Sequence, residues 1–505
     1  MPEYRIIEGL TRGLRTDLRQ NRNEQGLLEM NNLIATEWGA KAIPIVSYPL
    51  TGPSLSITWP HPQIMNGQYN RLLCNKTTIH EAVANATANA LSFVGSVAPT
   101  TSSNQWEMAS FQNDIWFLTN VTNFVYRIPS NLGNNPAVVT SFTANTVANY
   151  QGKLCVGGIG GTVPSKLTSF FNEWKELDHA PDITIGENTT LGKNWIIYSD
   201  FGGSARDTPF LDFMSMFDQY GGNTISNDLK TDMNVVIRDG LESGSIGFFP
   251  LKMSGDILRL IPVGDGLMAY TTSGVSYIRW TEQGFVEDIR SDVGLLYRGC
   301  AGGDLKGHIY IDANDHFNQV DANGNVQRLG YREFGATLLT NEVVICLDPE
   351  ERTYTISDSA SGYHLTRTGL SRTNAVRPTS MFRMPSFHGL AGTAVVASNP
   401  QSCGIRTDTF DGGYRGVHEV VNVRIATYDL TTTGWTVAVA WRLNKNDAFT
   451  TENAVVFDDR GNARVKVSGI EFQLILSAPD RQFAELERVE VEMRQGGKKK
   501  FRQLM

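Results

Sequence analysis

The stretch from Tyr310 to Gly330 reads YIDANDHFNQVDANGNVQRLG. It contains two clusters of acidic and Asn residues, at positions 312–315 and 321–325. Such clusters are typical of calcium-binding loops, in which side-chain oxygens recur at alternate positions. The same residue types are also typical of tight turns between strands. The stretch is therefore either a metal site or two corners of a β-sheet, and the two alternatives imply different folds.

The EF-hand pattern helps to separate these alternatives. It requires acidic or amide ligands at alternate positions, then Gly, and finally a bidentate Glu. Counted from Asp312, the Gly position holds Phe317, and counted from Asp321, the final Glu position holds Arg332. Both frames fail, whereas Asn323-Gly324 is the strongest hairpin signal in the chain. The sequence favours two successive turns of one β unit, with calcium binding as the less favoured alternative.

This stretch belongs to a pattern that recurs through the middle of the chain. A polar or Gly turn leads into a short run of β-prone residues, then another turn and a second run. The copies lie at 111–128, 150–159, 192–201, 263–280, 305–320 and 340–357. Most of their first turns recur at intervals of about 40 residues, the period of four-stranded propeller blades. We expect an all-β chain with a β-propeller over residues 45–384, and a β-sandwich with accidental spacing is the alternative.

The repeat is interrupted near residues 202–255, where almost two periods pass without a clear copy. Thr208 can cap a helix at this point, and Pro209 suits its first turn. Apolar side chains at helical spacing follow at Phe210, Phe213, Met214 and Phe217. We expect an inserted short helix packed on the propeller, with a partner-binding or membrane-active stripe as the alternative. Because the insertion interrupts the repeat, it is the first candidate for a subunit contact.

The sequence changes character at both ends of the repeat. Residues 385–505 predict a C-terminal β domain of the sandwich type, or a layer that closes the propeller, followed by a basic tail at 496–502. The expected strands are 417–428, 432–443, 454–457, 463–476 and 485–494, with a hairpin turn at 458–462. Residues 1–44 are first basic and then apolar, and they predict an N-terminal arm that lies on a neighbour and leads into the first blade.

Composition excludes several classes of function. The net charge is −8 and the isoelectric point is near 5.6, which argues against a surface built to bind nucleic acid but not against a wall past which DNA slides. No run approaches the length of a membrane span, and no signal peptide opens the sequence, so we expect folding in the cytosol. The cysteines are far apart, which favours separate thiols over a metal or redox site. They are Cys74, Cys155, Cys300, Cys346 and Cys403.

The search for chemistry predicts no catalytic, cofactor-binding or metal-ligating residues. The histidines show no metal-ligand spacing. They are His61, His80, His179, His308, His316, His364, His388 and His418. The cluster from Gly157 to Gly161 lacks the spacing of a phosphate-binding loop and favours a tight turn. A glycosidase pair of carboxylates stays open as an alternative, because acidic residues are plentiful.

Three features together resemble the tail nozzle or hub proteins of short-tailed bacteriophages, the family that includes tail tubular protein B. The first is the N-terminal segment, with Asn32-Leu33, Gly39, Lys41 and Pro44 at the positions where the chain enters the first blade. The second is the blade pattern VGDGLMAYTTSGVSYIRW, followed by VGLLYRGCAGGDLKGHIYIDANDHFNQVDANGNVQRLGYREF. The third is the β-rich C-terminus, which contains ELERVEVEMRQGG.

The resemblance implies a structural virion protein without enzymatic activity. Such proteins are β-propellers with an added β domain, and they assemble in the host cytoplasm as a ring that is typically a hexamer. The ring lies below the portal and its adaptor, or head-to-tail connector, ring. Genomic DNA passes through its lumen without specific binding, and its rim holds tail fibres or a needle or plug. An acidic balance and a head-to-tail subunit contact are consistent with this arrangement.

Two other functions stay open on the sequence. The first is a propeller-type glycan-binding or glycan-degrading tail protein, motivated by Trp280-Thr281-Glu282 and Trp174-Lys175-Glu176. The second is a generic cellular propeller scaffold. No cofactor is expected under any of the three readings.

Overall fold

A computed structural model describes residues 3–15, 26–42, 50–51, 59–65, 68–74, 79–85, 90–97, 106–111, 114–119, 124–128, 137–160, 192–199, 247–281, 284–338, 343–348, 352–358, 362–373, 380–384, 387–391, 402–412, 416–427, 434–479 and 485–495. Nearly every element in these ranges is a β-strand. Among them, no helix is long and apolar enough to cross a membrane.

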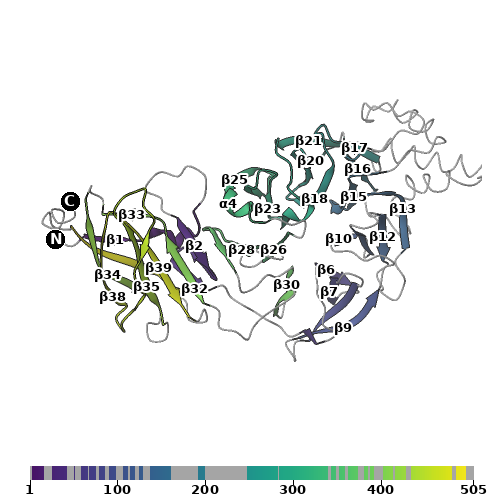
Figure 1. The fold of residues 1–505 in the computed structure, drawn as a ribbon. Coiled ribbons are helices and arrows are strands. Elements are labelled where there is room, and N and C mark those ends of the chain that lie inside the picture. The colour runs from purple at the N-terminus through teal and green to yellow at the C-terminus, as the bar shows by residue number, and fades with distance from the viewer. Residues whose placement is uncertain are drawn as a thin grey trace, which may run out of the picture.

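The described middle of the chain forms successive sheets, which we number blades 1 to 7 (Figure 1). Blades 2 to 6 are antiparallel meanders of four consecutive strands. Blade 1 contains β5 (Leu50–Thr51), β6 (Trp59–Met65), β7 (Gln68–Cys74), β8 (Ile79–Asn85) and β9 (Ala90–Val97). Blade 2 contains β10 (Trp106–Phe111), β11 (Asp114–Thr119), β12 (Phe124–Ile128) and β13 (Ala137–Thr143). Blade 3 contains β14 (Thr146–Tyr150), β15 (Lys153–Gly157), β16 (Trp195–Tyr198) and β17 (Gly247–Pro250).

The remaining blades continue the same order. Blade 4 contains β18 (Ile257–Val263), β19 (Gly266–Thr271), β20 (Val275–Thr281) and β21 (Gly284–Ser291). Blade 5 contains β22 (Ala301–Asp304), β23 (Gly307–Ile311), β24 (Phe317–Asp321) and β25 (Val326–Gly330). Blade 6 contains β26 (Val344–Asp348), β27 (Thr353–Ser357), β28 (Gly362–Leu365) and β29 (Leu370–Arg372). Blade 7 contains β30 (Ser380–Met384) and β31 (Phe387–Ala391). Two short helices, η3 (Arg298–Cys300) and α4 (Arg332–Gly335), lie before and after blade 5.

The blades close into a ring. One strand of each blade contacts the corresponding strand of the next, in the order β6, β10, β14, β18, β22, β26 and β30, and β30 returns to β6. In blades 2 to 7 these are the first strands, and in blade 1 the additional strand β5 lies at the opposite edge from β6. The first strands therefore surround a central axis, and the later strands of each blade lie farther out (Figure 1). The predicted all-β propeller is confirmed. The closed circle of contacts also shows that blades 1 to 7 make up the described ring.

Hydrogen bonds between neighbouring blades hold the ring together at the turns that follow the first strands. The hydroxyl of Tyr150 donates to the carbonyl of Asp265 at 2.6 Å, from blade 3 to blade 4. The backbone N–H of Gly264 donates to the carbonyl of Leu305 at 2.7 Å, from blade 4 to blade 5. The hydroxyl of Tyr354 donates to the carbonyl of Gly307 at 3.2 Å, from blade 6 to blade 5.

Burial explains why the middle blades read as apolar runs. Every residue of β19 is buried, because neighbouring blades cover both faces of the strand. The first strand of blade 5 contains Gly302 and Gly303 for a related reason, since a Cβ at Gly302 would meet the carbonyl of Ile345 in blade 6 at 2.7 Å. The close packing of neighbouring blades thus favours apolar residues in β19 and Gly in β22.

The rest of the described chain forms a β-sandwich beside blade 6. One sheet has the order β1-β41-β34-β38 and the other contains β2-β32-β39-β35-β36, with β33 and β37 at its side. A small sheet, β3-β4-β40, adjoins them. The strands are β1 (Glu3–Ile6), β2 (Leu27–Asn31), β3 (Leu33–Thr36), β4 (Gly39–Ala42), β32 (Cys403–Thr407), β33 (Phe410–Asp411), β34 (His418–Ala426), β35 (Thr436–Arg442), β36 (Thr450–Thr451), β37 (Val455–Val456), β38 (Asn462–Gly469), β39 (Glu471–Ala478), β40 (Glu485–Leu486) and β41 (Arg488–Gln495). β2 also pairs in parallel with β29, so this sheet continues that of blade 6.

The predicted N-terminal arm is corrected by this pairing. β1 pairs with β41, β2 with β32, and β4 with β40, so the start of the chain is built into the C-terminal β domain. The reason is burial: Leu27, Met30 and Leu33 are completely buried in the shared core. A chain with these side chains exposed would lose roughly 1.5–3 kcal/mol for each of them.

Three further boundaries differ from the prediction or lie outside the description. The predicted propeller limit at residue 384 falls inside the β30–β31 hairpin, so blade 7 extends to Ala391. The predicted strand 463–476 is two strands, because the chain turns at Ile470 from β38 into β39 of the opposite sheet. Nearly all of the insertion near 202–255, its helix and the basic tail at 496–502 lie outside the described residues.

Candidate functional site

The two clusters of the stretch 310–330 are five-residue turns with the same geometry. In the turn at 312–316, Oδ1 of Asp312 accepts the backbone N–H groups of Asn314 at 2.9 Å and His316 at 3.0 Å. In the turn at 321–325, Oδ1 of Asp321 accepts the N–H groups two and four residues further on, at 2.8 and 2.9 Å. The fourth residue of each turn has positive φ, with Asp315 at 67° and Gly324 at 72°. The prediction of two successive turns is confirmed.

The carboxylates of these turns point at backbone donors rather than into a shared site. Desolvation raises the pKa of Asp321, but the hydrogen bonds from Asn325 and Asn323 together outweigh it and lower that pKa below its ordinary value. Across the described ranges, no three His, Cys, Asp or Glu side chains are placed to hold a metal ion. The oxygen spacing that suggested calcium therefore serves the backbone in both turns.

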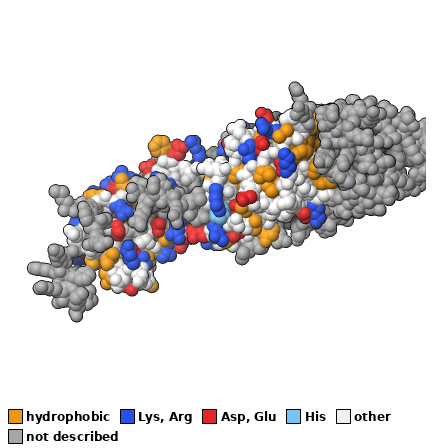
Figure 2. All heavy atoms as spheres, turned by 90° about the horizontal axis from the view of Figure 1, so that it is seen from above, with side chains coloured by type: hydrophobic (Ala, Val, Ile, Leu, Met, Phe, Trp, Pro, Cys, Tyr) orange, Lys and Arg blue, Asp and Glu red, His pale blue; other side chains and the backbone are white. Residues whose placement is uncertain are grey.

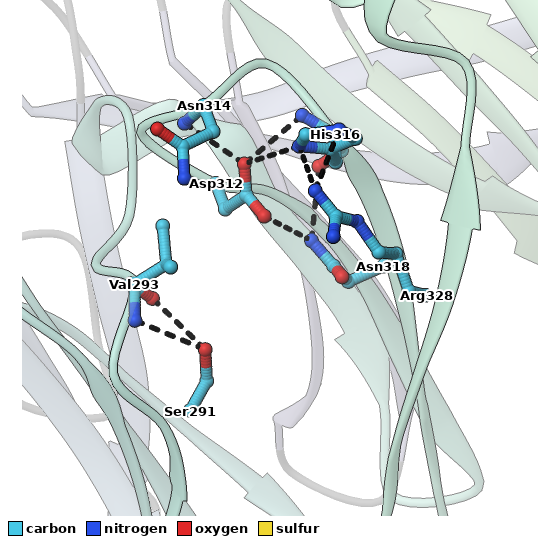
Figure 3. Close-up of polar contacts among 7 residues, drawn as sticks. All are labelled: Ser291, Val293, Asp312, Asn314, His316, Asn318 and Arg328. Carbon is cyan, nitrogen blue, oxygen red and sulfur yellow. Dashed lines mark hydrogen bonds and ion pairs between the residues drawn. The ribbon is translucent and has the colours of Figure 1, made fainter. Parts of the chain in front are cut away.

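The Asp312 turn is surrounded by further side-chain contacts (Figure 3). Its Oδ2 accepts the side-chain amide of Asn318 at 3.1 Å, and the ring of His316 lies 3.5 Å from Oδ1. Nη2 of Arg328, on the outermost strand of blade 5, lies 2.6 Å from both ring nitrogens of His316. Asp312, His316 and Asn318 are all buried. This network fixes the corner between β23 and β24, which is a structural task.

The other candidates from the sequence also lie in structural positions. Gly158 has a φ of 71° and sits where a Cβ would meet the carbonyl of Ile257 at 2.5 Å, so the described part of the 157–161 cluster is the predicted turn. Burial raises the pKa of Cys155 and of Cys300 to about 12, which suppresses the thiolate. Cys346 and Cys403 are also buried, and neither forms a disulfide with another described cysteine.

Two histidines connect strands instead of binding a metal. Nε2 of His308 lies 2.9 Å from the carbonyl of Pro262, and Nδ1 lies 3.2 Å from the hydroxyl of Tyr270, so the ring joins blades 4 and 5. Nδ1 of His364 lies 3.1 Å from Oγ1 of Thr355 within blade 6. Burial lowers the pKa of His308 and of His364 to about 4. The structure says nothing of the side chains of His61, His80 and His388, and His179 lies outside the described residues.

Trp280, a candidate for glycan contact, is half-buried and packs between blades 3 and 4. The ammonium of Lys153 is 4.5 Å from the centroid of its indole ring and 5.3 Å from that of Tyr198. Phe285 packs edge-on against Trp280 at 4.8 Å. The indole therefore joins blades 3 and 4, while Glu282 and the 174–176 segment lie outside the described residues.

The most concentrated group of charges that the structure describes lies at one end of the propeller axis. Glu107 is the second residue of β10 and is buried. Its Oε1 accepts the hydroxyl of Thr146, the first residue of β14. That hydroxyl accepts the N–H of Leu260 on β18 at 2.9 Å. First strands of blades 2, 3 and 4 are thus linked in sequence.

Arg298 completes this group from the far side of the axis. Its Nε donates to Oε2 of Glu107 at 2.9 Å, and its Nη2 lies 2.8 Å from the same oxygen, so the ion pair is made through one carboxylate oxygen. Arg298 belongs to η3, which leads into blade 5, whereas Glu107 belongs to blade 2. These blades are not neighbours in the ring, so the pair crosses the axis. Arg259 of blade 4 donates to the carbonyls of Arg298 and Ala301 and holds η3 in place.

We call Glu107, Thr146, Arg259 and Arg298 the axis cluster. Its chemistry is that of an ion pair with supporting donors: one carboxylate, two guanidinium groups and a hydroxyl. The cluster itself holds a single carboxylate, that of Glu107. The sequence search missed it, because Glu107 and Arg298 are 191 residues apart and match no motif.

Comparisons with known proteins place the chain in no family. No family model and no curated protein matches it. Similar solved structures include the WD40 β-propeller domain of Doa1, with a TM-score of 0.35, 8% identity, and coverage of 68% of this chain and 92% of that one. An exo-β-1,3-galactanase from Phanerochaete chrysosporium has a TM-score of 0.28, 9% identity, and coverage of 88% and 98%. A functionally unknown protein from Desulfotomaculum acetoxidans has a TM-score of 0.34, 7% identity, and coverage of 66% and 89%. The fold assignment rests on the strand pairing above, and these likenesses assign no function.

Proposed function

We propose that this chain is a structural virion protein, the subunit of a tail nozzle or hub ring of a short-tailed bacteriophage. In this role copies of the chain form a closed ring, typically a hexamer, beneath the portal and its adaptor ring. Genomic DNA leaves through the lumen between the copies, and the rim holds fibres or a plug. The proposal assigns no reaction and no cofactor to the chain.

The observation that carries the proposal is the axis cluster. An ion pair between Glu107 and Arg298 crosses the axis of the propeller, so the axis of one subunit is not a route for a polymer. A conduit built from this chain must then run between copies, which requires a ring.

The surface charge supports the proposal as well. Lys and Arg side chains are interspersed with Asp and Glu over the described face in Figure 2, without a large patch of either sign. The whole chain carries a net charge of −8. A mixed and mildly acidic wall holds few counterion-releasing contacts with phosphates, so DNA moves past it without binding.

Electron microscopy of the purified chain, alone and with the adaptor ring, tests the proposal, together with mass spectrometry of virions. We expect closed rings with a central lumen and the chain among the virion proteins. A halo assay on host lawns separates the glycan-active alternative, for which we expect no clearing. A chain that stays monomeric in every mixture and is absent from virions would overturn the proposal.

A further inference from the structure

The outer sheet of the sandwich, β1-β41-β34-β38, ends in two strands that pair on one side only within the described residues. β1 is bonded to β41 and β38 to β34. Strands at such edges present unpaired backbone N–H and C=O groups, which pair readily with a strand of another chain. The two edges differ in sequence, so a contact between them joins two different surfaces of the molecule.

Strand direction makes these edges compatible. β1 is antiparallel to β41, β41 to β34, and β34 to β38. β38 therefore runs opposite to β1. If a second copy is placed beside the first with little rotation, its β38 lies antiparallel to β1 of the first copy. The alternation of the sheet then continues across the boundary, which would fail for a sheet with an odd number of strands.

The side chains on the outer face are complementary as well. One register row runs across the sheet as Tyr4, Glu492, Asn422 and Arg464. Tyr4 and Ile6 at the β1 edge are 65% and 48% exposed, although both are large and apolar. Arg464, at the opposite end of the row, is exposed. The row thus has an aromatic ring at one edge and a cation at the other, a pair that attracts when the edges meet.

The next row runs as Ile6, Glu490, Arg424 and Asn462, so it ends in an amide. A shift of the contact by two residues places Arg464 beside Ile6 and Lys466 beside Tyr4. Ile6 lies beside Glu490 on β41, as Tyr4 lies beside Glu492. Lys466 is exposed and follows Arg464 on the same face of β38. The stems of Arg464 and Lys466 can cover the two apolar side chains, while their charges reach the two glutamates behind them. Arg488 and Arg494 already pair with these glutamates from within β41, and a carboxylate accepts more than one such donor.

We infer that β38 of one copy pairs antiparallel with β1 of the next copy, with Arg464 and Lys466 over Tyr4 and Ile6. The inference rests on the proposed function and names the subunit contact of that ring. The contact is head-to-tail, because the two edges differ. Such contacts generate a ring when the rotation between copies closes. The partner is therefore a second copy of this chain.

Disulfide trapping tests the register directly. Tyr4→Cys combined with Arg464→Cys, or with Lys466→Cys, brings two thiols within bridging distance across the contact in one of the two registers. Under mild oxidation we expect a ladder of covalent oligomers on a denaturing gel, ending at the ring number. The wild-type chain and each single variant are the controls, and they give no ladder beyond dimers. Cys155, Cys300, Cys346 and Cys403 are buried, and all variants are made in a Cys74→Ser background so that the fifth cysteine cannot cross-link.

Charge reversal gives a second readout. Lys466→Glu places a like charge against Glu490 and Glu492 of the next copy, and we expect association at least about tenfold weaker by sedimentation. Lys306→Glu is the matched control, because Lys306 is an exposed lysine on a turn of blade 5, and we expect no change. Both positions are exposed, so circular dichroism should show the wild-type fold for both.

The outcomes separate this inference from the proposed function. Rings that form without a ladder, or that withstand Lys466→Glu as well as Lys306→Glu, would overturn the β38–β1 contact and leave the ring in place. A wild-type chain that never forms rings, with or without the adaptor ring, would overturn both. Rings together with a ladder and a selective loss in Lys466→Glu establish the contact.

Discussion

The propeller and the sandwich are both made of β-strands, but they recruit those strands differently. Each of blades 2 to 6 uses four consecutive strands, so its pairing is local in sequence. The sandwich pairs opposite ends of the chain, as β1 with β41 and β2 with β32. The comparison teaches that local pairing leaves a repeat that can be read, whereas pairing between the termini leaves none.

The difference extends to how charges are used. The ion pair of Arg298 and Glu107 in the propeller is largely buried, with side-chain exposures of 16% and 9%. The ion pairs on the outer face of the sandwich include Arg494 with Glu492, in which the arginine is 58% exposed. The buried ion pair fixes two non-neighbouring blades relative to each other, whereas the exposed ion pairs of the sandwich can also contact a neighbouring copy.

The largest expected effect comes from removing residues 1–44. If β1, β2 and β4 belong to the sandwich, their loss removes one of the two partner strands of β41 and of β32, and it removes Leu27 and Met30 from the core. Each buried side chain of this kind contributes about 2–5 kcal/mol. We expect hydrogen exchange to show loss of protection over 402–495 while blades 2 to 6 stay protected. Full protection of 402–495 in the truncated chain would instead support the original prediction that residues 1–44 form a separate arm.

The second largest effect is expected from variants that break the ion pair of the axis cluster. Arg298→Ala or Glu107→Ala leaves a buried charge without its partner, and we expect each to lower the free energy of unfolding by about 3–5 kcal/mol. The double variant should cost less than the sum of the two, because the pair is lost only once. Arg494→Ala in the sandwich is the matched control, at less than about 1 kcal/mol. Denaturant titration measures all four, and additive losses would show that the two residues do not interact.

The third effect is a pH dependence confined to the propeller. Burial lowers the pKa of His308 and His364 from 6.5 to about 4 in the folded chain, so the unfolded chain binds more protons between these values. Their contribution is fully present above pH 6.5 and is lost as the pH falls toward 4, on the order of 3 kcal/mol for each histidine. His308→Gln removes this titration and should flatten the pH dependence of unfolding. An unchanged slope would contradict the assignment.

The smallest expected effect concerns a type of turn that occurs in both the propeller and the sandwich. Asp458 accepts the N–H groups of Arg460 and Asn462 at 2.9 and 2.8 Å, the same pattern that Asp321 makes in blade 5. Asp321→Ala and Asp458→Ala should therefore lower the unfolding temperature by small and similar amounts, because each removes the same pair of turn hydrogen bonds. Asp312→Ala should cost more, because its turn is buried. Thermal unfolding measures the three, and a loss at Asp458 far larger than at Asp321 would show that the turns are not equivalent.

The candidate site shows where prediction from sequence ends. The turns at 312–316 and 321–325 were predictable, because an Asx turn is decided by five adjacent residues. The axis cluster was not, since Glu107 and Arg298 meet only after blades 2 and 5 have taken their places in the ring. Trp280 was misleading for a related reason: its sequence context resembles an exposed loop, but blade 3 covers it with Lys153.

The sequence by itself determined the strands, the turns between them and the period of about 40 residues that defines a blade. It determined these because they depend on neighbours a few residues apart. Only the tertiary structure decided that the first strands close into a ring from β6 to β30, and that residues 3–42 complete the C-terminal sandwich. These outcomes depend on which apolar faces find each other across hundreds of residues, and no local pattern records that choice.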